Sequence, residues 1–437
     1  MRIIVRSASN NDARAVQEFL GAAEFEAAAL PGPAAYATAL PEGEDVVVVP
    51  ALDGDLARAG AYFEDLPSDS QRLCALAAVP FETLLSTNLA FETPFDGVIA
   101  IDGPRKLLGA QIDAYVRKAV AVEERTRRFA TAVALNVKLP GPSRPKPLKA
   151  LYIGAPSTQF LALERAFAPA PGLVAAAFTS FCGFDYLHDE AFDAVVLNGA
   201  KDPATAIGLC AALRRNAQLY HMPTMVLTAP DDAATRDAAV ERGASVAVAA
   251  NAPFEAPLGW LFEAIRRERI RKAAERDNFA LRDLMGDPRT GLFRKKMFEA
   301  HVQRLAIEHH ASGRPFSIAI LRATARAGIN QISEEAWRRG FGEVCSLAGR
   351  LIRDTDCATA IAEDAIAIAL PSTAVIGARK SAERIASVAE CTAFSAGDAT
   401  DQPLAFERSA AELQPGESGE ALLARVEREL LEERATA

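Results

Sequence analysis

The stretch RDTDCATAIAEDAIAIALP, residues 353–371, predicts a β-hairpin. A polar loop leads into an apolar strand, two acids follow at Glu363 and Asp364, and a second apolar strand runs to Pro371. Two apolar runs of strand length joined by a short polar turn are typical of a hairpin. Tight hairpin turns usually contain glycine, but this one has none. The hairpin thus presents two acids at its tip and an Arg-x-x-Asp, Arg353 to Asp356, just before its first strand.

Helices and strands alternate on both sides of this hairpin, from residue 287 to residue 437. The sequence predicts helices at residues 295–311, 334–352, 374–389 and 418–434, and strands at 316–323 and 392–399. A hairpin placed inside such an alternation predicts a mixed sheet, so we expect an α+β domain.

Two earlier segments alternate apolar strands with helices. Buried strands are expected near residues 45–50, 73–79 and 97–102, and again at 148–156, 192–200 and 222–229. Continuous apolar strands separated by helices indicate parallel, doubly wound α/β sheets, here two in tandem. Between them, residues 139–147 hold four prolines in nine residues and form the predicted linker.

These patterns divide the chain into predicted segments at residues 1–138, 139–147, 148–257, 258–286 and 287–437. The segment at 258–286 is predicted to be a long helix with a basic, solvated middle. It is interpreted as a rigid connector, with a binding helix as the alternative.

Composition narrows the class of protein. The net charge of −9 argues against a general nucleic-acid surface. Six scattered cysteines form no CxxC, and the five histidines show no metal spacing, so no metal site is expected. Because the start turns polar within six residues and no run approaches about 20 apolar residues, we expect a cytoplasmic protein without membrane insertion.

The last segment resembles a GGDEF domain, the diguanylate cyclase fold. The entry DPRTGLFRKKMF, residues 287–298, matches the family's D-x-L-T-G-L-x-N-R-R-x-F pattern at several positions. The matching residues are Asp287, Thr290, Gly291, Leu292 and Phe298. The hairpin tip AEDAI, residues 362–366, stands where the family carries its Gly-Gly-Asp/Glu-Glu-Phe motif. The two preceding segments resemble CheY-like receiver domains, so the layout resembles the PleD type of response regulator in two-component signalling.

The resemblance implies a site that differs from a working cyclase. The family holds two magnesium ions with one acid on the first strand and one at the third hairpin position. Here Asp364 takes the hairpin position, but Arg322 stands in place of the first-strand acid, and a cation repels magnesium. Ala362 and Glu363 replace glycines that let the nucleotide approach the backbone. Glu363, Asp364 and Arg322 are therefore interpreted as a degenerate active-site remnant, with no catalytic residue and no enzyme activity.

The Arg-x-x-Asp stands where the family carries an inhibitory site for cyclic di-GMP, five residues before the hairpin motif. The resemblance therefore implies that Arg353 and Asp356 bind this ligand, with Arg384 as a second arginine and Arg214 as a further cation. A guanidinium can hydrogen-bond guanine O6 and N7, and a carboxylate can accept from guanine N–H groups. The alternative is an exposed helix-end ion pair of little energetic value.

The receiver-like segments lack most of the residues that the resemblance requires for phosphorylation. Asn198 occupies the phosphoacceptor position in the second segment, where only Thr228 fits the pattern. In the first segment Pro50 takes that position, and Asp53 and Asp55 lie just beyond it. Asp55 is the candidate phosphoacceptor, with a polar loop residue as the alternative. Receivers of this kind often serve as dimerisation surfaces, so a homodimer is expected.

Taken together, the resemblance implies a cyclic di-GMP effector of the alphaproteobacterial cell cycle. It would be a non-enzymatic adaptor that binds cyclic di-GMP without another cofactor, goes to a cell pole and recruits protein partners. One of its tasks would be to deliver a regulator to the ClpXP protease. Two alternatives stay open: a diguanylate cyclase with an atypical site, and a response regulator switched by phosphorylation.

Overall fold

The computed structural model describes residues 1–31, 45–64, 72–86, 94–139, 141, 146–168, 172–253, 255–325, 334–392 and 404–436. The chain forms two compact units, Met1–Ala119 with Pro142–Lys272 and Val120–Gly141 with Ala273–Ala437. Two long helices, α4 (Arg105–Ala134) and α9 (Glu255–Met285), each give their first part to the first unit and their second part to the other. The predicted domain bounds at residues 138 and 287 stay predictions.

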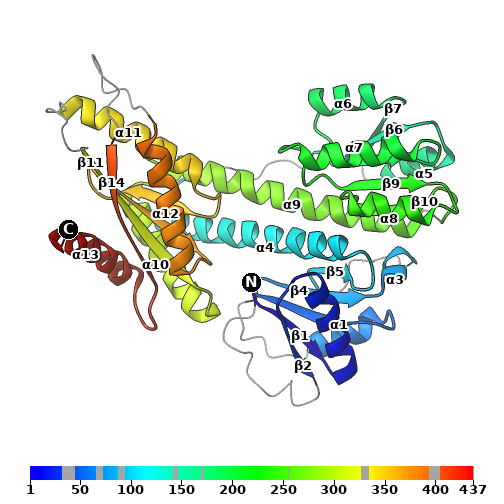
Figure 1. Cartoon of the computed structure of the whole chain (residues 1–437), viewed down its shortest axis with the longest axis horizontal. Helices are drawn as coiled ribbons and strands as arrows, with labels where there is room; N and C mark the ends of the chain where they lie inside the picture. Colours follow the sequence, from blue (N-terminus) through cyan, green and yellow to red (C-terminus); the bar gives the residue numbers. More distant parts are fainter. Residues whose placement is uncertain are drawn as a thin grey trace. The chain divides into compact units, whose positions relative to one another are not determined.

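The first unit begins with a parallel five-stranded sheet in the order β2-β1-β3-β4-β5 (Figure 1). Its elements are β1 (Ile3–Ser7), α1 (Asn10–Ala22), β2 (Ala27–Pro31), β3 (Val46–Pro50), α2 (Leu56–Glu64), β4 (Cys74–Val79), α3 (Phe81–Ser86) and β5 (Gly97–Ala100). This strand order is the doubly wound order found in CheY, so the predicted α/β sheet is confirmed. Sequence reasoning missed β2, because its AAALP run has no β-branched residues and no alternation.

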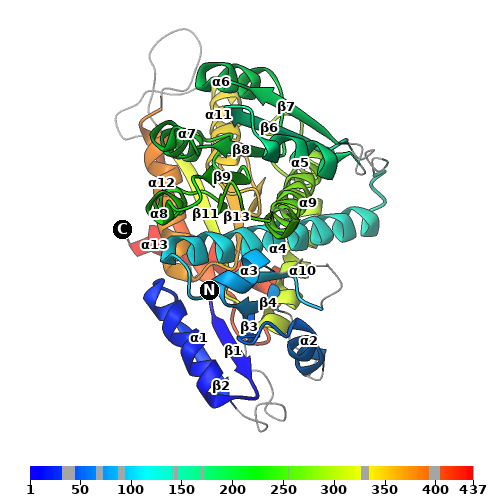
Figure 2. The ribbon, with the colours of Figure 1, turned by 90° about the vertical axis from the view of Figure 1, so that its right-hand side faces the viewer.

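The same unit contains a second parallel sheet in the order β10-β9-β8-β6-β7. Its elements are β6 (Lys149–Gly154), α5 (Thr158–Phe167), β7 (Leu173–Ala177), α6 (Ser180–Asp189), β8 (Ala194–Asn198), α7 (Pro203–Arg215), β9 (Thr224–Thr228), α8 (Ala233–Glu241) and β10 (Val246–Ala249). Figure 2 shows α5 and α9 on one side of this sheet and α6, α7 and α8 on the other. Neither β7 nor α6 was predicted.

Both faces of this second sheet are buried, which explains its continuous apolar strands. Tyr152 and Val196 pack with the side of α5 and α9, while Ile153 and Leu197 pack with α7 and α8. Each strand therefore buries alternate residues on opposite faces.

The second unit has a four-stranded sheet in the order β12-β13-β11-β14. Its elements are α10 (Lys295–Ser312), β11 (Phe316–Ala325), α11 (Glu334–Leu351), β12 (Cys357–Ala360), β13 (Ala365–Pro371), α12 (Val375–Glu390), β14 (Leu404–Glu412) and α13 (Gly419–Thr436). All three strand pairs are antiparallel, so the predicted mixed sheet is wrong, although the domain is α+β as expected. The predicted strand at 392–399 falls almost wholly outside the described residues, and the fourth strand is β14, which follows it.

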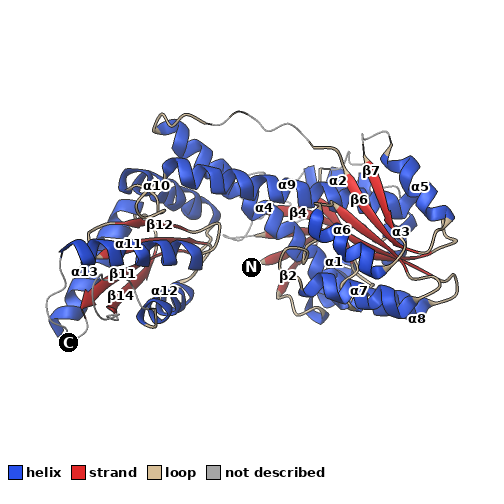
Figure 3. Cartoon of the chain, turned by 90° about the horizontal axis from the view of Figure 1, so that it is seen from above, coloured by secondary structure: helices blue, strands red, loops and turns tan. Residues whose placement is uncertain are grey.

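Helices cover both faces of this sheet (Figure 3). Ile366 and Ile368 pack against α11 and α12, and Ile318 and Ile320 pack against α10 and α13. Because residues that are neighbours along β11 and β13 face opposite ways, every strand residue between Ala365 and Pro371 is buried.

Helix α9 departs from its prediction in one respect. Its basic middle is only partly solvated: Arg266 and Arg276 are exposed, as predicted, but the guanidinium of Arg267 lies over the Tyr115 ring at 4.4 Å and over the Trp260 ring at 5.8 Å. Arg269 donates to Asp193 Oδ1 at 2.8 Å. Within the first unit, Arg267 therefore stacks on aromatic faces and Arg269 pairs with an acid. In the described part of the chain, no helix has the length and apolar character needed to cross a membrane.

Candidate functional site

The Arg-x-x-Asp forms a closed turn between the end of α11 and the start of β12. Arg353 N donates to Asp356 Oδ2 at 2.9 Å, and Asp356 N donates to Arg353 O at 3.0 Å. The Arg353 side chain is exposed, whereas Asp356 is only 5% exposed. The carboxylate thus holds the turn by a backbone contact, which is a different arrangement from the exposed helix-end ion pair considered as the alternative.

The carboxyl group of Asp356 is held in an unusual electrostatic state. Burial raises its pKa to about 6, against the lowering effect of the Arg353 backbone N–H and guanidinium. Its second oxygen, Oδ1, is buried and accepts no hydrogen bond from the described residues. The carboxyl group therefore keeps one unused acceptor near the Arg353 guanidinium.

A buried arginine from α4 supports this turn from inside the second unit. Arg128 Nη2 donates to Asp354 O at 2.7 Å and to Asp356 O at 3.1 Å, and Nη1 donates to Asn278 O at 3.0 Å. Its Nε donates to Glu124 Oε1 at 2.6 Å. Since Arg128 is 2% exposed, one guanidinium fixes the turn, α4 and α9 together within this unit.

Glu124 is the counter-charge that makes this burial possible. Burial alone would raise its pKa, but Arg128, His301 and Arg127 hold the pKa at about 2. Sequence reasoning missed Glu124 and Arg128 as site residues. The available signal was their spacing, because a Glu followed four residues later by an Arg on a helix predicts an ion pair.

The structure brings Arg384 to the same turn. Arg384 Nη2 donates to the carbonyl of Leu351 at 2.9 Å, so it caps the C-terminal end of α11 just before Arg353. Its side chain is exposed like that of Arg353. Two exposed guanidinium groups and one carboxylate are therefore gathered at one turn on the surface of the second unit.

Arg214 belongs to the other unit and is engaged there. Its guanidinium donates to Gly243 O and Tyr220 O, each at 2.7 Å, to Met222 O at 3.0 Å and to Thr224 Oγ1 at 3.1 Å. These contacts give Arg214 a structural role in the second doubly wound fold. Its role in ligand binding stays a prediction.

The hairpin turn that was interpreted from the sequence as an active-site remnant holds an ion pair. Arg322 on β11 pairs in register with Ala365, and its Nε lies 3.5 Å from Asp364 Oδ2. A backbone hydrogen bond also joins β11 to this turn, because Ala323 N donates to Asp364 O at 2.7 Å. Trp337 Nε1 donates to Glu363 O at 3.0 Å, which holds the tip from the side of α11. The Arg322 cation thus lies beside the Asp364 carboxylate.

The tip folds without glycine because its backbone does not need the left-handed region. Among the described non-glycine residues, φ is positive only at Glu24, Asn136 and Ser372. The connection between the strands is closed by Ile361 N, which donates to Ala365 O at 2.9 Å. A four-residue connection of this kind can be built without a primed two-residue turn.

The candidate phosphorylation residues occupy structural positions. Asp55 is exposed and its Oδ1 accepts from Arg58 N at 2.9 Å, so it caps the start of α2. Asp53 pairs with Arg58 at 2.5 Å. At the end of β8, Asn198 donates to Ala155 O at 2.8 Å. The assignment of Asp55 as a phosphoacceptor stays a prediction.

Within the described residues, no group of three or more His, Cys, Asp and Glu side chains could hold a metal ion. The cysteines lie apart and are free, four of them buried and Cys182 and Cys391 exposed.

No protein-family model and no curated protein matches the sequence. Solved structures that resemble part of the chain include several GGDEF domains. The GGDEF domain of DgcB from Caulobacter crescentus in complex with c-di-GMP is 22% identical, with a TM-score of 0.31, over 35% of this chain and 89% of that one. The diguanylate cyclase SiaD from Pseudomonas aeruginosa, in complex with its activator SiaC, is 19% identical, with a TM-score of 0.31, over 39% of this chain and 69% of that one.

The GGDEF domain of FimX from Pseudomonas aeruginosa is 13% identical, with a TM-score of 0.31, over 35% of this chain and 95% of that one.

Proposed function

We propose that this protein is a cyclic di-GMP-binding effector that makes no cyclic di-GMP itself. The observation that carries the proposal is the gathering of Arg353, Arg384 and Asp356 at one turn, with both guanidinium groups exposed. Arginine forks bind guanine O6 and N7 or phosphate, and the carboxylate accepts from guanine N–H donors. Two such guanidinium groups suit a ligand with two guanine bases and two phosphates.

The proposed absence of cyclase activity rests on the remnant turn. Two-metal catalysis needs acids that hold both ions against the substrate phosphates. Here the Arg322 guanidinium lies 3.5 Å from the Asp364 carboxylate, so the acid is already neutralised by protein. Ala362 and Glu363 add a side chain and a negative charge where the nucleotide would pass.

At the level of the cell, we propose an adaptor role. The combination resembles PopA, a cyclic di-GMP effector of the alphaproteobacterial cell cycle. On that resemblance the protein is cytoplasmic and goes to a cell pole on binding ligand. It acts there as a homodimer and recruits a mediator protein that helps deliver a regulator to the ClpXP protease. This part of the proposal depends on the resemblance alone.

Calorimetric titration of the full chain with cyclic di-GMP tests the ligand assignment. We expect micromolar or tighter binding, on the order of −8 kcal/mol. Arg353→Gly should lose roughly 2 kcal/mol or more, since a hydrogen bond to a charged group contributes about 1.5–3 kcal/mol.

Arg350→Gly is the matched control, because Arg350 is exposed on the last turn of α11, three residues before Arg353. Equal affinities for the two variants, or no binding by the wild type, would refute the proposal.

A further inference from the structure

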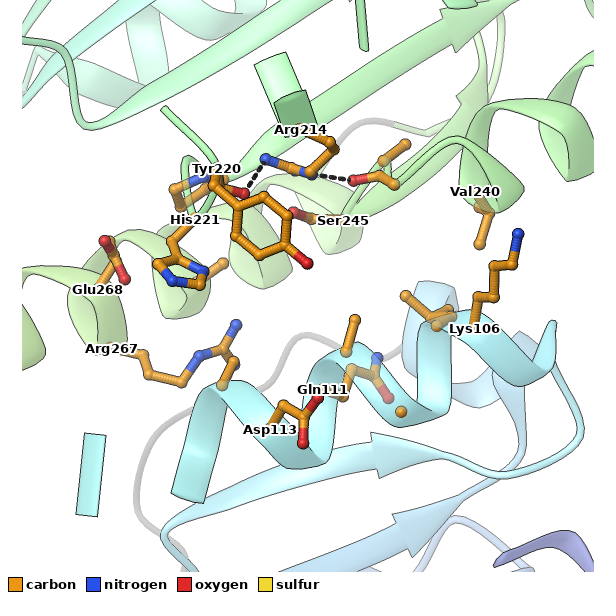
Figure 4. Close-up of a pocket in the computed structure, with 18 of the residues that line it drawn as sticks. Lys106, Gln111, Asp113, Arg214, Tyr220, His221, Val240, Ser245, Arg267 and Glu268 are labelled. Carbon is orange, nitrogen blue, oxygen red and sulfur yellow. Dashed lines mark hydrogen bonds between the residues drawn. The ribbon is translucent and has the colours of Figure 1, made fainter. Parts of the chain in front are cut away.

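The first unit contains a cavity that the proposed function does not use. It has a volume of about 490 Å³ and lies between the first part of α4 and the second doubly wound fold. Figure 4 shows Gln111 and Asp113 on α4 facing Arg214, Tyr220 and His221 across this space. The volume falls in the range of cavities that hold small organic ligands.

The walls of this cavity carry more positive than negative charge. The lining cations are Lys106, Arg117, Arg214, Arg242 and Arg267. The lining acids are only three, Asp113, Glu241 and Glu268, whereas the whole chain has a net charge of −9. The positive excess is therefore local, and it favours an anion.

Several of these charges are already paired. Lys106 Nζ lies 3.0 Å from Glu241 Oε2, and Arg267 Nη1 lies 3.0 Å from Glu263 Oε2. Arg214 is held by backbone carbonyls, as described above. Arg117 is different: its Nε is buried and has no hydrogen-bond acceptor among the described residues.

A second donor in the lining also lacks an acceptor. Gln111 is 3% exposed, and its Oε1 accepts from Ala100 N at 2.9 Å. Its Nε2 is buried and finds no partner in the described part of the chain. A buried donor without an acceptor is destabilising, so two of them lining one cavity indicate a missing acceptor.

The electrostatic surroundings of His221 also indicate an excess of positive charge in this cavity. The pKa of His221 is lowered to about 4, first by burial and then by the nearby charges of Arg117 and Arg271, against the raising effect of Glu268. The imidazole is therefore neutral at pH 7. Its ring and that of Tyr220 meet edge to face, with centroids 4.7 Å apart and planes 84° apart, so they offer two aromatic walls at nearly a right angle beside the free donors.

We propose that this cavity binds a small organic anion through its oxyanion group, a carboxylate or a phosphate ester. Arg117 and Gln111 donate to the oxygens, and the rings of Tyr220 and His221 pack against the rest of the molecule. This site is independent of the Arg-x-x-Asp turn, so it stands whether or not that turn binds cyclic di-GMP.

Thermal unfolding and calorimetry of the full chain test the site with four probes: inorganic phosphate, citrate, adenosine 5′-monophosphate and adenosine. We expect at least one anion to raise the unfolding temperature and to bind with a measurable Kd, and adenosine, which has no oxyanion, to do neither. Citrate and the phosphates distinguish a carboxylate from a phosphate site.

Two variants locate the binding. Arg117→Gln should weaken it by at least about tenfold, as loss of a charged hydrogen bond implies. Gln111→Glu keeps the acceptor for Ala100 N but removes the free donor and adds a negative charge, so it should abolish binding. Arg215→Gln is the control, since Arg215 is exposed and neighbours Arg214 without lining the cavity. Variants are compared only if their unligated unfolding temperatures match that of the wild type.

The proposal is overturned if none of the three anions binds at millimolar concentration, if adenosine binds as well as its monophosphate, or if folded Gln111→Glu binds like the wild type. Because Arg353→Gly should leave this binding unchanged, failure here is distinguishable from failure at the turn.

Discussion

Asp356 is a single side chain whose burial disfavours its charged form. Its carboxyl is buried, one of its oxygens has no partner among the described residues, and its pKa is raised to about 6 from the usual 3.8. A raised carboxyl pKa means that the folded chain holds the proton more tightly than the unfolded chain. The stability that this group contributes is therefore present below about pH 4 and is lost as the pH rises through 6.

The first prediction follows from the raised pKa of Asp356. Asp356→Asn keeps an acceptor for Arg353 N but removes the buried charge, so it should raise the free energy of unfolding at pH 8 by about 2–3 kcal/mol. Below pH 4 the difference should vanish. Urea unfolding followed by tryptophan fluorescence measures both values, with Asp354→Asn as an exposed control at the same turn. A variant less stable than the wild type at pH 8 would show that the carboxylate stabilises the turn instead.

The tip of the hairpin does not require glycine for its fold. Ala362 and Glu363 are exposed, and their φ angles stay outside the left-handed region, so neither position demands glycine for the fold.

At the scale of elements, α4 contributes to the candidate site although it precedes that site by more than 200 residues. Arg128 Nη2 reaches Asp354 O across 226 residues of sequence. The pairing of Arg128 with Glu124 on the same helix lets the guanidinium lie in the core of the second unit, where its remaining donors find carbonyls. The turn is thus held by a helix that sequence reasoning assigned to a different domain.

Removing that guanidinium should destabilise the second unit. Arg128→Met leaves Glu124 buried with one less counter-charge, and breaking a buried pair on one side typically costs about 3–5 kcal/mol. Arg125→Met is the matched control on the same helix: Arg125 pairs with Asp277 at 3.5 Å with both side chains about a third exposed, so its loss should cost less than about 1 kcal/mol. Equal unfolding free energies for the two variants would contradict the role assigned to Arg128.

Two strands of the second unit, β13 and β14, show which kind of strand can be predicted from the sequence. β13 is apolar throughout and buried at every position, and its prediction is confirmed. β14 was missed because LAFERSAAE mixes charges with alanines, as expected of a strand with some exposed positions. β14 is recognisable as a strand only when it pairs with β11 over nine residue pairs.

At the scale of the whole molecule, the proposed loss of cyclase activity is testable directly. Purified protein with GTP and magnesium should yield no cyclic di-GMP above a protein-free background in chromatography of the products. Arg322→Asp should not restore activity, because the proposal also assigns an obstructing role to Ala362 and Glu363. Product that scales with protein concentration and disappears in Asp364→Ala would revive the alternative of a cyclase with an atypical site.

The sequence by itself determined the two parallel sheets, the hairpin and the spacing of Arg353 and Asp356 before it. These features follow from local apolar runs and short-range spacing, which a chain carries in its order of residues. Only the tertiary structure decided that Asp356 is buried, that Arg322 lies against Asp364, that Arg214 is held by carbonyls of its own fold and that Arg128 fixes the turn. In each case a polar side chain contacts a partner that becomes its neighbour only when distant segments pack together. A local sequence pattern does not specify which partner that is.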